Sequence, residues 1–305
     1  MECRLCPRSC GADRTQRRGV CGADSAVRIA RAAAHHWEEP CISGTRGSGA
    51  VFFVGCPLGC VFCQNREIST GENRGTATDA EGLARIFLSL QQQACHNLNL
   101  VTATPYTDAC LAALDRIGDK RTVPVVWNSG GYETKETVRR LSPAVSVFLP
   151  DYKFSDPALG SAFAHAPDYP AVALDAIREM VRITGKPVFD DDGILVRGTM
   201  VRHLVLPGHR ADSLQILTRL YEEFGNDEIL LSLMWQYTPN GTACEGHPEL
   251  GRRVVSFEYR SVADRAAELG FSGYLQERSS ADRSFTPPFD GTGTSAAADT
   301  NQKTD

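Results

Sequence analysis

The sequence AVFFVGCPLGCVFCQ at residues 50–64 holds the pattern on which the predicted fold depends. Five apolar residues lead into a glycine, and Cys56, Cys60 and Cys63 follow. A short, continuously apolar run of this kind is typical of a strand buried on both faces of a parallel sheet. Three thiols therefore follow the carboxyl end of a predicted strand, which is where parallel α/β folds place their active sites.

The same alternation of strand and helix continues along the chain. Apolar, β-branched runs predict strands at 50–55, 98–103, 123–127, 145–149, 199–206 and 229–235. Amphipathic segments between and after them predict helices at 80–94, 107–117, 134–141, 171–184, 212–224 and 261–269. Six such units indicate an α/β fold in which a parallel barrel closes fully or in part, with a doubly wound open sheet as the main alternative.

Composition divides the chain into three parts. Residues 1–49 form a Cys-rich N-terminal extension, residues 50–278 hold the strand–helix core, and residues 279–305 form a C-terminal tail. From residue 291 the tail has no apolar side chain larger than alanine, so we expect disorder at least from there.

Bulk properties limit the class of protein. The 305 residues are 42% hydrophobic, which is enough for a sizeable core, and a net charge of −5 argues against a general nucleic-acid binder. No apolar run approaches the ~18 residues of a membrane helix, and the N-terminus shows no secretory signal. We therefore expect a cytoplasmic protein without membrane or nucleic-acid partners. Its eleven cysteines should stay reduced, and their clustering favours metal binding or chemistry over disulfides.

Three thiols at C-x3-C-x2-C spacing can point toward one place. A structural zinc site normally has four protein ligands, and a ferredoxin-type iron–sulfur cluster has four cysteines. The trio of Cys56, Cys60 and Cys63 therefore leaves one coordination position open to another ligand. The alternative is a zinc loop that a distant Cys or His completes.

The trio, with Phe62 before its last cysteine, resembles the radical S-adenosylmethionine (SAM) superfamily. Longer segments are similar to the subfamily of pyruvate formate-lyase (glycyl-radical) activating enzyme-like proteins. These segments are CRLCPRSC at 3–10, EEPCISG at 38–44, GCPLGCVFCQN at 55–65, NLNLVTATPYT at 97–107, LPDYKF at 149–154, VRHLVLPG at 201–208 and LMWQYTP at 233–239.

The resemblance implies a partial (β/α)6 TIM-like barrel and an oxidoreductase. Cys56, Cys60 and Cys63 would hold a 4Fe–4S cluster, and SAM would bind the open iron. Reductive cleavage of SAM would give a 5′-deoxyadenosyl radical that abstracts hydrogen from a substrate. A glycyl or other peptide site is the expected substrate, with a small metabolite as the alternative. The electron would come from reduced flavodoxin or ferredoxin.

The resemblance also assigns SAM contacts to polar residues at predicted strand ends. Asp151 and Lys153 match a D-x-K pair that helps to hold SAM in the activating enzymes. Positions i and i+2 of a strand share a face, so both can face the barrel mouth, while a solvated ion pair is the alternative. Further candidate SAM contacts are Phe62, Thr102, Thr104 and Asn128, of which the two threonines stand where many members of the superfamily have a G-G-E stretch.

Two adjacent polar residues, Arg202 and His203, lie in the fifth predicted strand. Strand alternation turns them to opposite faces, so one of them faces the barrel interior. We name His203 as a candidate SAM contact, with a satisfied core histidine as the alternative. The candidate substrate contacts are Arg202, Gln236 and Tyr237. The polar stretch 38–41 (EEPC) can also lie near the mouth.

Cys3, Cys6, Cys10 and Cys21 form a second set of four thiols, here called the lead thiols. Four ligands are a closed set, which suits zinc or an auxiliary 4Fe–4S cluster. The spacing leaves zinc, a cluster or no ligand open. A non-enzymatic zinc or iron–sulfur module for electron transfer or scaffolding is the second hypothesis for the whole protein.

Overall fold

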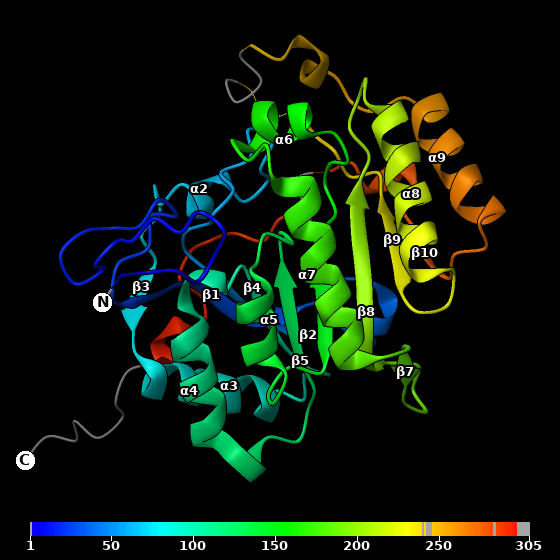
Figure 1. Ribbon diagram of the computed structural model, residues 1–305. Helices are drawn as coiled ribbons and strands as arrows, with labels where there is room; N and C mark the ends of the chain where they lie inside the picture. The colour runs from blue at the N-terminus through cyan, green and yellow to red at the C-terminus, as the bar shows by residue number, and fades with distance from the viewer. Residues whose placement is uncertain (1, 240, 242–245, 283–284, 298–305) are drawn as a thin grey trace, which may run out of the picture.

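A computed structural model describes residues 2–239, 241, 246–282 and 285–297 (Figure 1). Its strands are β1 (Val27–His35), β2 (Ser48–Phe53), β3 (Thr76–Thr78), β4 (Leu98–Val101), β5 (Val125–Ser129), β6 (Val147–Pro150), β7 (Val188–Phe189), β8 (Leu195–Leu204), β9 (Leu230–Met234) and β10 (Gly273–Leu275). They form one sheet in the order β10-β9-β8-β6-β5-β4-β2-β1-β3, and β7 pairs with β8. Neighbours from β10 to β2 are parallel, and β1 is antiparallel to both β2 and β3.

Helices cover the outer face of the parallel strands (Figure 1). The longer ones are α3 (Ala80–Gln92), α4 (Thr107–Ile117), α5 (Lys135–Leu141), α6 (Pro157–Ala164), α7 (Tyr169–Thr184), α8 (Arg210–Phe224) and α9 (Ser256–Glu268). Two single-turn helices, α1 (Pro40–Ser43) and α2 (Arg66–Ser69), lie in connections. Short 3-10 turns are at Thr104–Tyr106, Gly118–Lys120, Pro248–Gly251, Arg278–Ser280 and Thr294–Ala297. Local chemistry sets the boundaries: Asp79, for example, begins α3 by accepting a hydrogen bond from the Gly82 amide.

The predicted α/β fold with a partial parallel barrel is confirmed. All six predicted strands are present, as β2, β4, β5, β6, β8 and β9, and a helix follows each of them. The structure adds β1 and β3 at one end of the sheet and β10 at the other. Since neighbouring parallel strands end at the same edge of a sheet, the polar residues that follow these strands gather there.

The interior of the barrel is closed from below by the connection between β1 and β2. Cys41 and Ile42 of α1 pack against interior residues of β5, β6, β8 and β9. The Asn97 side chain donates a hydrogen bond to the Ile42 carbonyl at 2.7 Å, and Ser43 Oγ donates to the His35 carbonyl at 3.1 Å. The residues just before α1 are therefore held under the cavity described below.

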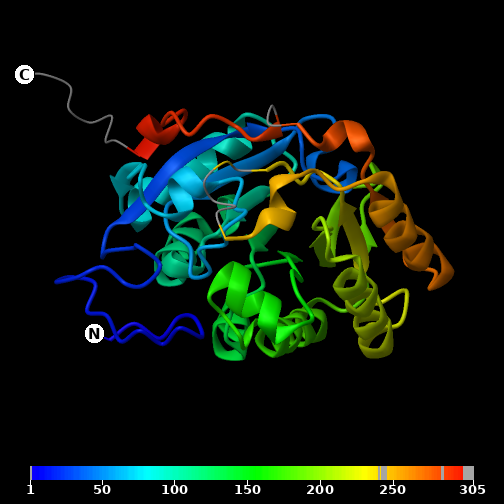
Figure 2. The same ribbon diagram turned by 90° about the horizontal axis from the view of Figure 1, so that it is seen from above.

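Residues 285–297, here called the C-terminal strap, run along β1 (Figure 2). The Gly291 amide donates to the Ala30 carbonyl at 3.0 Å, and the Ala32 amide donates to the Thr292 carbonyl at 2.8 Å. β3 pairs with Val27–Ile29 of β1 and does not extend further along that strand. The strap provides backbone partners for the residues of β1 that follow. Positions 291–294, where composition favours disorder, are thus held by backbone hydrogen bonds; residues 298–305 lie outside the described residues.

Within the described residues, no helix is both long and apolar enough to cross a membrane.

Candidate functional site

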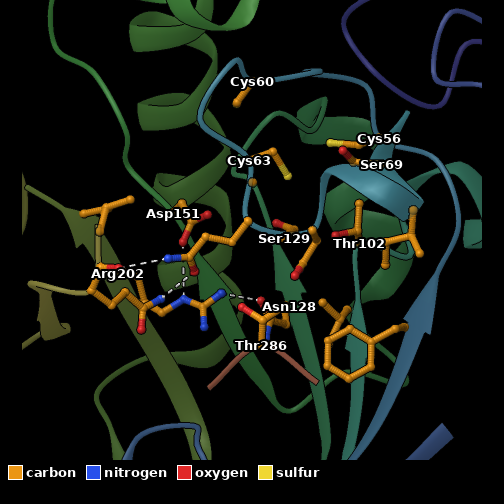
Figure 3. A pocket seen from close by; sticks show the side chains of 18 of the residues that line it. Cys56, Cys60, Cys63, Ser69, Thr102, Asn128, Ser129, Asp151, Arg202 and Thr286 are labelled. Carbon is orange, nitrogen blue, oxygen red and sulfur yellow. Dashed lines mark hydrogen bonds and ion pairs between the residues drawn. The ribbon is translucent and has the colours of Figure 1, made fainter. Parts of the chain in front are cut away.

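A cavity opens at the carboxyl ends of the parallel strands (Figure 3). The loop after β2 contributes Cys56, Cys60 and Cys63. The strand ends and the residues just after them contribute Thr102, Asn128, Ser129, Asp151, Lys153, Arg202 and Gln236. The C-terminal part of the chain contributes Asp282, Phe285, Thr286 and Pro287. The sequence-based expectation that polar residues follow the strands toward one place therefore describes the lining well.

The trio lies in a tightly held loop. The Gly55 amide donates to the Ile68 carbonyl at 2.8 Å, so α2 anchors the start of the loop. Burial raises the pKa of Cys56 to about 11, and burial raises the pKa of Cys60 as well. A thiol of this kind becomes a thiolate when a metal ligates it. Three thiols on one loop, facing a cavity that holds the Lys153 ammonium, are a donor set that fits an iron–sulfur cluster with one open position.

Asp151 and Lys153 form a buried ion pair, with Lys153 Nζ 2.5 Å from Asp151 Oδ2. Their side chains are 16% and 18% exposed, so the pair differs from the solvated pair that the sequence left open. Burial by itself raises the pKa of Asp151, but Lys153 and Arg202 outweigh it and hold that pKa below its ordinary value. Asp151 is therefore a carboxylate at neutral pH, beside an ammonium group in the same cavity.

Arg202 is the interior-facing residue of the adjacent pair on β8. Its guanidinium contacts Asp151 Oδ1 at 3.2 Å, Glu38 Oε2 at 3.1 Å and Asn128 Oδ1 at 2.5 Å. The second Glu38 oxygen accepts from Asn99 at 3.0 Å and from Asn128 at 3.2 Å. One arginine thus joins two carboxylates and an amide from separate elements into a fixed floor of the cavity.

His203 faces the opposite way, and its predicted contact with SAM is wrong. Its side chain is 2% exposed, with Nδ1 2.9 Å from the Tyr152 carbonyl and Nε2 2.8 Å from Ser213 Oγ on α8. Burial lowers the pKa of His203, so the neutral ring donates from Nδ1 to the carbonyl and accepts from the serine hydroxyl. His203 is the satisfied core histidine that the sequence left as the alternative.

Two further predicted contacts lie outside the cavity. Thr104 is buried in a 3-10 turn, where its hydroxyl donates to Glu133 Oε1 at 2.7 Å. Tyr237 is 1% exposed, and its hydroxyl donates to the Leu250 carbonyl at 2.6 Å. Both side chains form hydrogen bonds within the surrounding structure and do not line the cavity.

The other predicted contacts do line the cavity. They are Phe62, Thr102, Asn128, Asp151, Lys153, Arg202 and Gln236. Thr102 has φ of +60°, a conformation that β-branched residues rarely adopt, and its amide donates to the Asn128 carbonyl at 2.8 Å. Strain of this kind is typical of functional sites, where the surrounding structure maintains it.

The lining also includes residues that sequence reasoning did not name as site residues. Glu38 lies in the floor, although the sequence indicated only that its stretch can lie near the mouth. The exposed Trp37 ring contacts Phe285 edge-to-face, with ring centroids 4.9 Å apart, at the rim beside the C-terminal strap. Aromatic residues in irregular segments carry no periodic signal, so only the fold brings these two together.

The lead thiols gather beside residues 55–65, here called the trio loop, which carries Cys56, Cys60 and Cys63. Cys6 and Cys21 are 8% and 6% exposed, and none of the four lead thiols is in a disulfide. Burial raises the pKa of Cys6 to about 12, and the neighbouring thiols Cys21, Cys3 and Cys10 raise it further through like charge.

A partial parallel barrel with three loop thiols at its mouth defines a class of α/β enzyme that holds a metal cluster at the strand ends. The profile of the Radical SAM superfamily matches residues 50–215, which are more than half of the chain. The chain therefore belongs to the radical SAM superfamily. Membership implies a 4Fe–4S cluster and SAM, and the trio and its cavity fit both.

Individual relatives give less detail. An uncharacterized protein of Methanocaldococcus jannaschii, MJ0674, is 28% identical over 275 residues, which are 87% of this chain and 74% of that protein. A radical SAM methyltransferase from Sphaerobacter thermophilus aligns with a TM-score of 0.50 at 12% identity, over 73% of this chain and 63% of its own. A domain of a pyruvate-formate lyase-activating enzyme from Bacteroides vulgatus gives a TM-score of 0.41 at 13% identity, over 57% and 92%. The methyltransferase shares the fold alone, and the activating-enzyme domain is too distant to carry an argument.

Proposed function

We propose that the protein is an enzyme that cleaves SAM reductively and, as a result, abstracts a hydrogen atom from a substrate in the same cavity. The observation that carries this proposal is the placement of the trio and the Asp151–Lys153 pair around one cavity. When bound, the cluster supplies the electron that breaks the SAM sulfonium bond, and the protein supplies position and charge.

The chain's own residues have separate tasks in this proposal. Cys56, Cys60 and Cys63 hold the cluster, and Lys153 pairs with the SAM carboxylate. Asp151 accepts a hydrogen bond from the SAM ammonium or the ribose hydroxyls. Asn128, held by Arg202, presents its polar group toward the ribose. Buried partners keep these side chains in single orientations, which lowers the entropy cost of binding SAM.

The substrate is proposed as a glycyl or other peptide site, as in the activating enzymes that the sequence resembles, with a small metabolite as the alternative. The rim offers amide groups to either. Gln64 Nε2 donates to the Gln236 carbonyl at 2.9 Å, and Gln276 Nε2 donates to Gln236 Oε1 at 3.0 Å. The proposed electron donor is reduced flavodoxin or ferredoxin, and the proposed compartment is the cytoplasm. The non-enzymatic module is the competing proposal.

The test is formation of 5′-deoxyadenosine by the anaerobically reconstituted protein with SAM and dithionite. We expect Cys60→Ala to abolish it and Cys95→Ala to leave it unchanged, because Cys95 is a buried thiol remote from the cavity lining. Lys153→Gln should raise the KM for SAM by about 10- to 100-fold while the cluster absorbance stays. A wild-type protein that carries four irons at the trio but yields no 5′-deoxyadenosine would contradict the enzymatic proposal and favour the module.

A further inference from the structure

The lead thiols are arranged around Arg14, a partly buried arginine. Arg14 Nη2 donates to Cys3 Sγ at 3.0 Å and lies 3.8 Å from Cys21 Sγ, and Arg14 Nη1 donates to the Pro105 carbonyl. A side chain on Gly19 would begin 3.4 Å from Cys21 Sγ, 3.5 Å from Cys10 Sγ and 3.8 Å from Arg14 Nε. Glycine at this position keeps open a space that sulfur atoms and a guanidinium surround.

One polar atom in this group has no partner. Arg14 Nε is buried and makes no hydrogen bond within the described structure. A buried donor without an acceptor is unfavourable, and a charged donor beside neutral thiols is a poor arrangement. A ligated site changes this, because thiolates and inorganic sulfides accept hydrogen bonds from a cation. The arginine therefore indicates that the thiols act as a negatively charged ligand set.

The ligand pattern favours iron–sulfur over zinc. Zinc sites of four cysteines usually consist of paired C-x2-C units, whereas Cys3 and Cys6 form the only such pair among the lead thiols. A cubane binds each thiolate through a different iron and so tolerates the irregular spacing of the lead thiols.

The lead thiols are joined directly to the trio loop. The Cys56 amide donates to the Cys21 carbonyl at 3.1 Å, so a lead thiol residue contacts the first residue of the trio through the backbone. Gly55, with φ of +95°, allows this approach, because a Cβ there would lie 2.5 Å from the Cys21 carbonyl oxygen. Arg8, between Cys6 and Cys10, donates from Nε to the Pro57 carbonyl at 2.8 Å.

We propose that Cys3, Cys6, Cys10 and Cys21 bind a second iron–sulfur cluster, which passes single electrons to the cluster held by the trio. A one-electron donor of the flavodoxin or ferredoxin class is oxidised as the second cluster is reduced. The second cluster is then reoxidised as the trio's cluster is reduced, so no bond forms or breaks in the transfer. Only the transfer rests on the proposed function; the second cluster does not.

Metal content tests the second cluster independently of SAM chemistry. In a variant with Cys56, Cys60 and Cys63 all replaced by alanine, we expect about four irons and four sulfides per chain and no zinc. Adding Cys3→Ala and Cys10→Ala should remove that iron, and adding Cys95→Ala instead should retain it. Circular dichroism checks that each variant is folded. One zinc per chain, or a folded trio variant with less than about one iron, would overturn the proposal.

A comparison of two reductants tests the transfer. Cys3→Ser with Cys10→Ser, in a chain that keeps the trio and its iron, should retain SAM cleavage driven by dithionite, a small reductant that can enter the cavity. Cleavage driven by reduced flavodoxin should fall by about 10- to 100-fold, the usual cost of disturbing a metal centre's support. A flavodoxin-driven rate of SAM cleavage that is the same in the substituted and the unsubstituted chain would overturn the transfer. Arg14→Leu should lower the reduction potential of the second cluster, because it removes a cationic hydrogen-bond donor to sulfur.

Discussion

At the scale of the residue, Arg202 determines the arrangement of the cavity floor. Its guanidinium contacts Asp151, Glu38 and Asn128 together. Two buried carboxylates in one cavity would repel each other, and the guanidinium between them removes that cost. The orientation of Asp151 toward SAM in the proposed site therefore depends on a residue from a different strand.

A double-mutant cycle measures this dependence. Arg202→Met should destabilise the protein by about 3–5 kcal/mol, because it leaves the Glu38 carboxylate without its cation and leaves Asp151 with Lys153 alone. In the double variant with Glu38→Gln, the loss of stability should be smaller than the sum of the losses in the two single variants by about 0.5–3 kcal/mol. The measurement is the free energy of unfolding in urea.

The exposed pair Lys186–Asp227, with side chains 64% and 63% exposed, provides the matched control. Lys186→Met should change the free energy of unfolding far less than Arg202→Met does, because an exposed ion pair contributes little. If the Arg202 and Glu38 substitutions proved additive, the floor would not act as a unit.

At the scale of the element, the start of α9 is fixed by one carboxylate. Glu258 Oε2 accepts from the Val255 amide at 3.0 Å, and Oε1 accepts from the Gly208 amide at 2.7 Å. Arg252 donates to both oxygens. This single side chain joins α9 to the loop after β8, and so positions the edge of the barrel that carries β9 and β10.

The contribution of Glu258 should depend on pH. The hydrogen bond from Arg252 is the main cause that lowers the pKa of Glu258 from 4.5 to about 2. A carboxyl group with a lowered folded-state pKa stabilises the fold fully above its ordinary pKa and loses that effect as the pH falls through the folded value. Glu258→Gln should therefore lower the stability at pH 7 by about 1–2 kcal/mol, and the difference should vanish between about pH 4 and pH 2.

Thermal unfolding from pH 7 to pH 2 checks this prediction. Glu268→Gln, at an exposed position at the other end of the same helix, should show little difference at any pH. A Glu258→Gln deficit that persists unchanged at pH 2 would mean that packing of the side chain, and not its charge, anchors α9.

The elements also show how far sequence could predict this structure. The six core strands were predictable because short apolar runs that alternate with amphipathic segments are typical of parallel strands buried on both faces. β1 was missed because Arg28 and Arg31 interrupt its apolar pattern, as an antiparallel strand near the surface allows, and β10 was missed because it has only three residues.

The sequence could place the site residues that lie at the ends of predictable strands, but not the others. The trio and the pair Asp151–Lys153 lie on or next to strands whose ends could be located, so their meeting follows from the topology. To choose between Arg202 and His203, one must know which side chains of β8 point into the barrel. The alternation of side chains along a strand does not by itself give that information. Glu38 reaches the floor from a connection below the barrel, and no periodic pattern predicts such a path.

At the scale of the whole molecule, the two ends of the chain enclose the site. The N-terminal extension contacts the trio loop through Cys21 and Arg8, and the C-terminal strap lies along β1 and lines the rim. A partial barrel leaves its first and last strands unjoined, so additional chain at that side limits access to the cavity. In this molecule the strap and β1 supply that chain, and Phe285 and Thr286 of the strap face the cavity.

Gly293 provides a way to release the strap. It has φ of +74°, and a Cβ there would lie 1.8 Å from the Ala32 carbonyl oxygen on β1. Gly71 has a nearly equal φ of +76° with no atom within 4 Å of such a Cβ, so it carries the same backbone strain without the clash. Gly71→Ala should cost about 1–2 kcal/mol from strain alone. Gly293→Ala should cost more, or displace the strap from β1, because the backbone atom it meets cannot rotate away.

Hydrogen exchange separates these outcomes, since the Ala32 amide is protected by the Thr292 carbonyl at 2.8 Å. In Gly293→Ala we expect faster exchange at Ala32 and unchanged exchange in the parallel strands β4 and β5, whose partners lie elsewhere in the sheet. If the strap also limits entry to the cavity, the same variant should bind SAM with faster association and dissociation than Gly71→Ala. Unchanged protection at Ala32 would show that the strap can shift without leaving β1. Access to the proposed active site would then be set by the mouth of the barrel alone.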